Sequence, residues 1–285
     1  MRLVEVALVL GCIVLPLTAR AQVAFPPDSA WIPLRCDGAP MSDRLQDQAG
    51  ALDERDIIGD AAAPAGLRAA DATNLYLRWR LEEDPAPGGA VRSFAWGMQF
   101  DLDDDRTDYE LMVLVDGIAG MSGSVSLFRN TTTTLRNSLN DPADQPAVAT
   151  YPFATNARSV TAPGSSYGGD ADFFLDVAVP WSALVSLGLD RETATYVWAA
   201  SSSSANSLDG DVACHDGASG AATLEGTASE QTTGDPARDP RGGPGGTGRL
   251  EGGGGCTAGG AGSPVVALAL LALRRRRRTR GPDLG

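Results

Sequence analysis

Apolar and polar side chains alternate along two stretches of the central chain, and a period of two predicts half-buried strands. In residues 75–81 the apolar positions are Leu75, Leu77, Trp79 and Leu81, and the positions between them are Tyr76, Arg78 and Arg80. In residues 93–100 the apolar positions are Phe94, Trp96, Met98 and Phe100, which alternate with Ser93, Ala95, Gly97 and Gln99. Each stretch predicts a strand with one face against a core, so Trp79 and Trp96 are expected to be core residues.

The remaining pattern predicts an all-β fold. Residues 109–115 are apolar on both faces, which indicates a central strand, and further strands are expected at 124–128, 172–179 and 195–201. Turns rich in Asp, Asn, Gly and Pro separate them, and a 3.6-residue period is scarce. We therefore predict an antiparallel β-sandwich of the jelly-roll or immunoglobulin-like type. Helix is expected only as a turn or two at 42–52 and at 181–187, where Trp181 follows Pro180 and closes one end.

The amino end carries the pattern of an export signal. Met1 and Arg2 precede an apolar run from Leu3 to Leu17, and Ala19 and Ala21 are small residues at the positions that a signal peptidase recognises. We predict that residues 1–21 form a signal peptide and that the mature chain begins at Gln22. The protein is therefore expected to be exported.

The last thirty residues combine a glycine run ending at Cys256, an apolar segment from Val265 to Leu273, and the arginines 274–278 and 280. A membrane-crossing helix needs roughly 20 apolar residues, so this segment is marginal. We predict a short C-terminal hydrophobic transmembrane helix that anchors the chain transiently in the inner membrane, with the arginine cluster on the cytoplasmic side. The alternative is a polybasic disordered terminus.

This tail, residues 252–280, resembles the MYXO-CTERM tails of myxobacterial surface proteins, relatives of the GlyGly-CTERM sorting signals. The resemblance implies that a membrane-embedded sorting protease removes residues 256–285 as a C-terminal sorting signal near the junction of Gly255 and Cys256. It also implies a final location at the cell surface or outer membrane, with Cys256 as the residue that would carry a lipid.

Cysteine positions and local composition divide the rest of the chain. Cys12 lies in the signal peptide and Cys256 in the tail, so Cys36 and Cys214 remain, and export favours a disulfide bond between them. Residues 217–255 are rich in Gly, Pro and Thr and have only Leu224 and Leu250 to bury, which predicts a disordered stalk. Residues 22–216 are left as one β-sandwich domain with a sizeable core.

The charge of the chain narrows the set of partners. The formal net charge is −13, and removing both terminal signals leaves 15 arginines against 34 carboxylates, a net charge near −19. Such an acidic surface repels nucleic acid and favours cations, so no nucleic-acid partner is expected.

One turn concentrates acidic residues at alternate positions, which suits the six to eight oxygen ligands of calcium. These residues are Asp101, Asp103, Asp105 and Asp108. The turn departs from an EF-hand loop, because Arg106 replaces the required glycine and Met112 the bidentate glutamate. We predict a structural Ca²⁺ site here, with a merely solvated acidic turn as the alternative. Asp209 and Asp211 are expected to form a turn, with a second cation site as their alternative.

The sequence lacks the catalytic residues that most enzyme classes need. His215 is the only histidine and the chain has no lysine, so there is little basis for a nucleophilic triad, a Schiff base or a histidine zinc site. Glycoside hydrolysis by two carboxylates remains open, although no pair stands out. We therefore predict that the protein is not an enzyme.

Several short sequence segments within residues 36–212 are similar to segments of DOMON-like and family 9 carbohydrate-binding-module-like sandwiches. They are residues 55–60, 76–78, 94–97, 101–105, 108–110 and 173–184. The last is the most specific, with a strand followed by Pro180, Trp181 and Leu184. The resemblance implies an open sheet face that binds sugars, or haem in some members. We place the ligand face at Tyr76, Arg78 and Arg80, with an ordinary solvated face as the alternative.

The predicted function is a surface-anchored, non-enzymatic module that binds carbohydrate or another envelope or extracellular component. Two alternatives remain: a secreted glycan hydrolase that uses two carboxylates, and a structural surface-coat protein without a small ligand.

Overall fold

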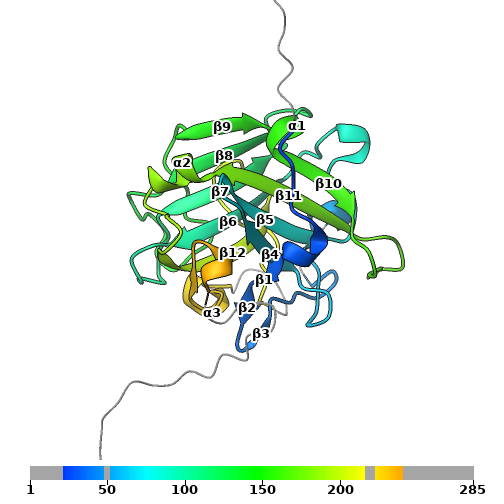
Figure 1. Cartoon of the computed structure of the whole chain (residues 1–285), viewed down its shortest axis with the longest axis horizontal. Helices are drawn as coiled ribbons and strands as arrows, with labels where there is room; N and C mark the ends of the chain where they lie inside the picture. Colours follow the sequence, from blue (N-terminus) through cyan, green and yellow to red (C-terminus); the bar gives the residue numbers. More distant parts are fainter. Residues whose placement is uncertain (1–21, 48–51, 216–221, 240–285) are drawn as a thin grey trace, which may run out of the picture. The chain divides into compact units, whose positions relative to one another are not determined.

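Two large antiparallel sheets form the frame of the protein in a computed structural model (Figure 1). The structure describes residues 22–47, 52–215 and 222–239. The expected signal peptide, membrane segment, arginine cluster and Cys256 lie outside these ranges. Within the described ranges, none of the helical segments has the length and hydrophobicity of a membrane span.

The first sheet has five strands in the order β1-β4-β5-β11-β10. They are β1 (Ile32–Pro33), β4 (Gly66–Ala70), β5 (Asn74–Leu81), β11 (Phe173–Pro180) and β10 (Ala157–Thr161). The second sheet has six strands in the order β13-β12-β6-β7-β8-β9. They are β13 (Thr232–Thr233), β12 (Ala194–Ser202), β6 (Ala95–Asp101), β7 (Leu111–Asp116), β8 (Ser124–Arg129) and β9 (Ala149–Pro152). A small hairpin joins β2 (Arg35–Cys36) to β3 (Ala39–Pro40).

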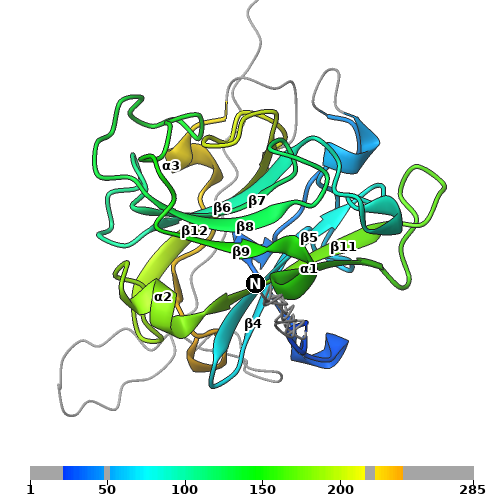
Figure 2. The same ribbon diagram turned by 90° about the horizontal axis from the view of Figure 1, so that it is seen from above.

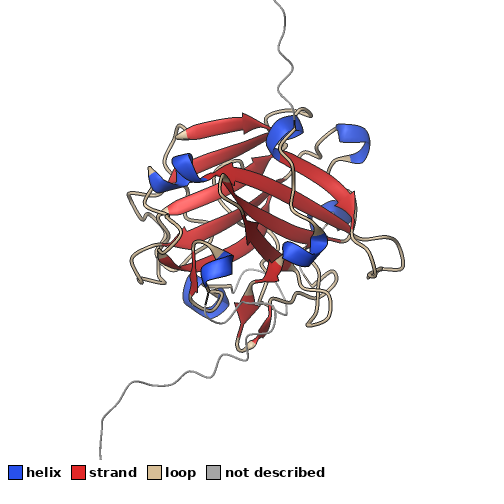
Figure 3. Cartoon of the chain, viewed as in Figure 1, coloured by secondary structure: helices blue, strands red, loops and turns tan. Residues whose placement is uncertain are grey.

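Helix is confined to short turns at the ends of the strands (Figure 3). The α-helical turns are α1 (Phe153–Asn156), α2 (Trp181–Val185) and α3 (Leu224–Thr227), and the 3-10 turns are η1 (Asp28–Ala30), η2 (Asp53–Arg55), η3 (Pro87–Gly89) and η4 (Pro236–Arg238). The turn predicted at 181–187 is confirmed as α2. The turn predicted at 42–52 is wrong for the described residues 42–47, because Asp43 instead forms a β-bridge with Gly59.

The inner faces of the two sheets share one hydrophobic core. Alternate residues of β5 and β6 contribute to it, and Trp79 and Trp96 are both fully buried. Strand β7 is paired on both edges, which confirms the prediction of a central strand. Figure 2 shows the two layers one above the other. The alternation in the sequence therefore predicted these strands and their inner faces correctly.

The outer faces are covered as well, which the alternation did not predict. Outside the first sheet, Trp31, Tyr76 and Phe174 belong to a second apolar cluster. Outside the second sheet, a third cluster includes Trp198 and Leu208. Gly97 on β6 lets the loop that contains Leu208 approach closely, because a Cβ atom there would lie 2.8 Å from the Leu208 side chain. Both sheets are therefore sandwiched between apolar layers.

Residues 222–239 belong to the fold, which corrects the predicted end of the domain and the predicted start of the stalk. Leu224 is fully buried, and its carbonyl accepts a hydrogen bond of 2.7 Å from the Trp198 indole. Strand β13 then pairs with the edge of β12, and Asp235 forms an ion pair of 2.6 Å with Arg191. A segment poor in apolar residues can order in this way because its edge hydrogen bonds and one buried leucine offset its entropy. The rest of the predicted stalk lies outside the described residues.

The predicted disulfide bond between Cys36 and Cys214 is present, with 6.1 Å between the two α-carbons. It joins the β2 strand to the segment after β12, across a sequence separation of 178 residues. Next to it, the Cys214 amide donates to the Ser42 carbonyl at 2.9 Å. The bond therefore ties the beginning of the fold to a segment near its end.

Because so long a loop is closed, replacing Cys36 and Cys214 together by serine should lower the free energy of unfolding by about 2–5 kcal/mol. Chemical denaturation, followed by tryptophan fluorescence, would measure the change. Cys256→Ser is the matched control and should unfold as the wild type does. Equal stability of the double variant and the wild type would contradict a stabilising role for the bond.

Candidate functional site

The three residues predicted to form an open ligand face are buried, so the expectation of an open face is wrong. Tyr76, Arg78 and Arg80 are 1%, 1% and 4% exposed. They do lie on the outer face of β5, as the alternation predicted, but the N-terminal segment crosses over that face. The Tyr76 hydroxyl donates to the Ala24 carbonyl at 3.1 Å, and the Phe25 ring lies 5.8 Å from the Tyr76 ring.

Arg78 is held on every side by the protein. Its guanidinium lies 4.0 Å from the ring centres of Trp31 and Phe174 and donates to both carboxylate oxygens of Asp176, at 2.6 and 2.9 Å. Asp28 accepts a further hydrogen bond at 3.1 Å. Cation–π contacts and a bidentate ion pair are among the strongest contacts an arginine makes. Arg78 therefore has a structural role in this conformation.

Arg80 stands at the end of the buried face, beside a shallow pocket. Its guanidinium stacks on Phe174 at 4.5 Å and donates to the Ser165 hydroxyl. The pocket has a volume of about 270 Å³ and lies between two loops. It is lined by Asp60, Ala62, Ala63, Gly164, Ser165, Ser166 and Tyr167. Of the three predicted ligand residues, only Arg80 contacts a residue of this pocket.

Two polar side chains of the pocket are already oriented. Asp60 accepts hydrogen bonds of 2.8 Å from the amides of Ala62 and Ala63, which lowers its pKa together with a hydrogen bond from Tyr167. Partial burial, and then the contact with Asp60, raises the pKa of Tyr167 to about 12. The carboxylate is therefore charged and the phenol neutral at physiological pH, and both are positioned before any ligand arrives.

The predicted calcium turn is only partly assembled. One carboxylate oxygen from each of Asp101, Asp103 and Glu110 lies within 4.8 Å of the others, and Glu110 is a residue that the spacing of aspartates in the turn did not predict. Asp105 instead pairs with Arg136 at 2.7 Å. Asp108 accepts a hydrogen bond of 2.9 Å from Thr133. Two of the four predicted carboxylates thus converge, and two turn to other partners.

Glu110 joins this group because the chain folds back at the turn and pairs residue 110 with the end of β6. The Glu110 amide donates to the Phe100 carbonyl at 3.0 Å, and the Glu110 carboxylate accepts from the Leu102 amide at 2.6 Å. Burial raises the pKa of Glu110 to about 7 and also raises the pKa of Asp101. Pairing the predicted strands 94–100 and 109–115 as a hairpin would have placed Glu110 beside the end of the first strand.

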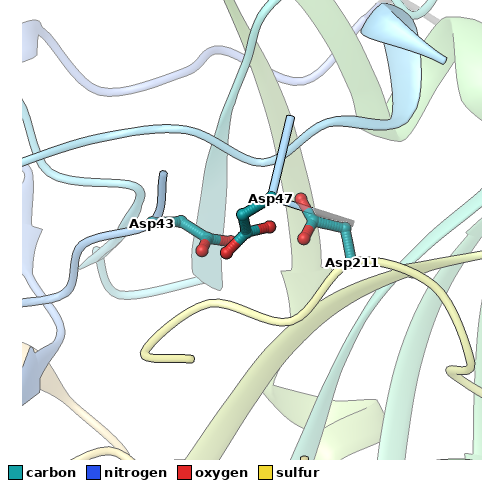
Figure 4. Close-up of side chains that lie close together, drawn as sticks. All are labelled: Asp43, Asp47 and Asp211. Carbon is teal, nitrogen blue, oxygen red and sulfur yellow. The ribbon is translucent and has the colours of Figure 1, made fainter. Parts of the chain in front are cut away.

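A second acidic group lies at the other end of β12, where Asp43, Asp47 and Asp211 point toward one another (Figure 4). One carboxylate oxygen of each lies within 4.8 Å of the others. Asp43 and Asp211 are 3% and 2% exposed. Burial raises the pKa of Asp211 to about 8 and also raises the pKa of Asp43. The sequence pattern did not predict Asp43 or Asp47 as members of a site. Asp211 was expected in a turn with Asp209, and a second cation site was the alternative.

Further carboxyl groups lie beside this cluster. Burial raises the pKa of Asp56 to about 6 and that of Glu82 to about 7. Asp56 is fully buried, and Glu82 is 8% exposed. Carboxyl groups that resist ionisation are therefore concentrated in one interior region of the protein.

A comparison of the chain with protein-family models, curated proteins and solved structures found no match.

The raised pKa values predict how the stability of the metal-free protein depends on pH. A carboxyl group whose pKa is raised on folding binds its proton in the folded state at pH values where the unfolded chain has lost it. The stabilisation is complete below about pH 4 and is lost as the pH rises through the folded-state values. These reach about 8 for Asp211, with Asp56, Glu82 and Glu110 between 6 and 7.

Thermal unfolding in a chelator should therefore give a melting temperature that falls between pH 5 and pH 8.5. Asp211→Asn should flatten the upper part of this curve, because the asparagine cannot ionise. Asp209→Asn, two residues earlier in the same loop, is the matched control and should leave the curve unchanged. A melting temperature that rises through this range would show that these carboxyl groups are ionised at no cost in the folded protein.

Proposed function

We propose that the protein is an exported, non-enzymatic binding module for carbohydrate, built as a β-sandwich of the DOMON-like type and sorted to the cell surface by its C-terminal tail. The pairing of two antiparallel sheets across one core supports the sandwich type. The disulfide bond between Cys36 and Cys214 supports an oxidising compartment.

The observation that carries the carbohydrate proposal is the pocket beside Arg80. It combines the half-buried ring of Tyr167, the charged carboxylate of Asp60 and the hydroxyls of Ser165 and Ser166. A sugar presents apolar C–H faces, which pack on an aromatic ring, and hydroxyls that hydrogen-bond to carboxylate and hydroxyl oxygens. The pocket is open and shallow, which suits the end of a glycan chain or a single sugar ring.

The composition of the pocket favours binding over hydrolysis. Asp60 is its one carboxylate, whereas glycoside hydrolysis needs two that flank the scissile bond. The carboxyl groups with raised pKa, which would suit a catalytic acid, do not line this pocket; they include Asp43, Asp56, Glu82 and Asp211. The glycan hydrolase and the surface-coat protein remain as outcomes of the test.

Glycan-array screening of the purified full-length protein, followed by calorimetry with the best ligand, tests this proposal. Tyr167→Ala should weaken binding by tenfold or more, because it removes the stacking surface. Tyr151→Ala, which removes another half-buried tyrosine on β9, is the matched control and should bind as the wild type does. Release of reducing sugar would support the hydrolase, and a lack of binding to every glycan would support the coat protein.

The sorting proposal has a separate test in the producing cell. Intact-mass measurement of protein extracted from the cell surface should give a chain that begins at Gln22 and ends before the arginines 274–280. Cys256→Ser should prevent processing and leave the protein in the inner-membrane fraction. A surface form that still carries the arginine cluster would contradict sorting by tail removal.

A further inference from the structure

The acidic cluster of Asp43, Asp47 and Asp211 brings together two segments that are far apart in sequence. Asp43 forms a β-bridge with Gly59, through two hydrogen bonds of 3.0 Å. Asp211 lies beside the end of β12, and its carbonyl accepts a hydrogen bond of 2.8 Å from the Ser201 amide. The backbone therefore fixes the positions of both carboxylates, and Figure 4 shows the three groups facing one another.

Part of each buried carboxylate is already bonded to the backbone. One oxygen of Asp43 accepts from the Arg44 amide at 3.1 Å, and one oxygen of Asp211 accepts from the Ile57 amide at 2.6 Å. These bonds orient both side chains, and a hydrogen bond also links the carboxyl groups of Asp211 and Asp47.

The second oxygen of Asp43 is an independent sign of a ligand. Asp43 is only 3% exposed, and its Oδ2 atom has no hydrogen-bond partner. An oxygen of the neighbouring Asp56 is also buried without a partner. Among the residues that the structure describes, no arginine forms an ion pair with Asp43 or Asp211. A buried carboxylate oxygen without a donor or a cation is costly, so a missing positive group would account for the arrangement.

The donor set identifies the class of cation. The cluster offers only carboxylate oxygens, which are hard ligands that favour Ca²⁺ over zinc or copper. The nearest cysteines in the sequence, Cys36 and Cys214, are joined in a disulfide bond and offer no thiolate. Each of the three carboxylates offers at least one oxygen to the shared space, and calcium accepts such irregular sets more readily than magnesium does.

We propose that Asp43, Asp47 and Asp211 form a calcium site that joins the N-terminal segment of the fold to the segment after β12. The site spans the same two parts of the chain as the disulfide bond, since Asp43 follows Cys36 by seven residues and Asp211 precedes Cys214 by three. Calcium and the disulfide bond therefore reinforce one connection. The site is independent of the proposed glycan pocket and needs no glycan to bind its ion.

Thermal unfolding and calorimetry of the full-length, chelator-treated protein test this site with calcium chloride alone. At a concentration a hundredfold above Kd, calcium should raise the melting temperature by about 5–10 °C. Asp43→Asn combined with Asp211→Asn should abolish this shift. At pH 8.5 and without metal, the same variant should melt higher than the wild type, because it removes buried carboxyl groups that ionise there while both backbone hydrogen bonds can still form. That rise distinguishes loss of the site from misfolding.

Two further variants show which acidic group binds the ion. Asp101→Asn with Glu110→Gln changes the other cluster and should leave a calorimetric binding event with a stoichiometry of one at the proposed site. Asp47→Asn keeps both buried aspartates and should weaken binding by tenfold or more. The proposal is overturned if millimolar calcium leaves the wild-type melting curve unchanged. It is equally overturned if the shift persists in the Asp43 and Asp211 variant and disappears in the Asp101 and Glu110 variant.

Discussion

The strand register of the first sheet depends on the pairing of Arg78 with Asp176. The two residues lie directly opposite each other on β5 and β11, and they share two hydrogen bonds beneath the rings that enclose the guanidinium. A shift of one residue in the pairing of these strands would turn Arg78 toward the inner core and separate it from its acid. Because an unpaired buried charge costs several kcal/mol, this pair selects one register, and the register in turn aligns the inner apolar residues of both strands.

The same pair explains why the outer face of β5 is covered. The Arg78 guanidinium needs an aromatic or acidic neighbour on each side, and the N-terminal segment supplies Trp31 and Asp28. Because the N-terminal segment covers this face, the open polar surface lies at the end of β5. There Arg80 donates a hydrogen bond to Ser165 of the neighbouring loop. The proposed glycan pocket therefore lies among the loops at the ends of the strands, and the sheet face itself serves the stability of the fold.

An excess of carboxylates sets the second constraint on this fold. Many of them are satisfied by backbone amides of nearby turns and loops. Asp71 accepts from the amides of Thr73 and Asn74, and Asp141 accepts from those of Thr134 and Leu135. Others pair with arginine. The two acidic clusters differ from these satisfied carboxylates, because in each cluster a buried aspartate keeps an oxygen without a hydrogen-bond partner: Asp43 in one and Asp101 in the other. Metal binding would balance the charge that neither arginine nor the backbone balances there.

The sequence by itself determined the all-β class, the inner faces of β5 and β6, the central strand β7 and the pairing of Cys36 with Cys214. These features follow from local periodicity and from the count of cysteines, which neighbouring chain segments do not alter. Tertiary structure decided which outer faces are covered, because a polar face has the same sequence pattern whether water or another segment lies over it. It also decided that Glu110 joins Asp101 and that Asp43 meets Asp211. Such contacts depend on strand register and on long-range closure of the chain, and neither is encoded in the spacing of residues along a single segment.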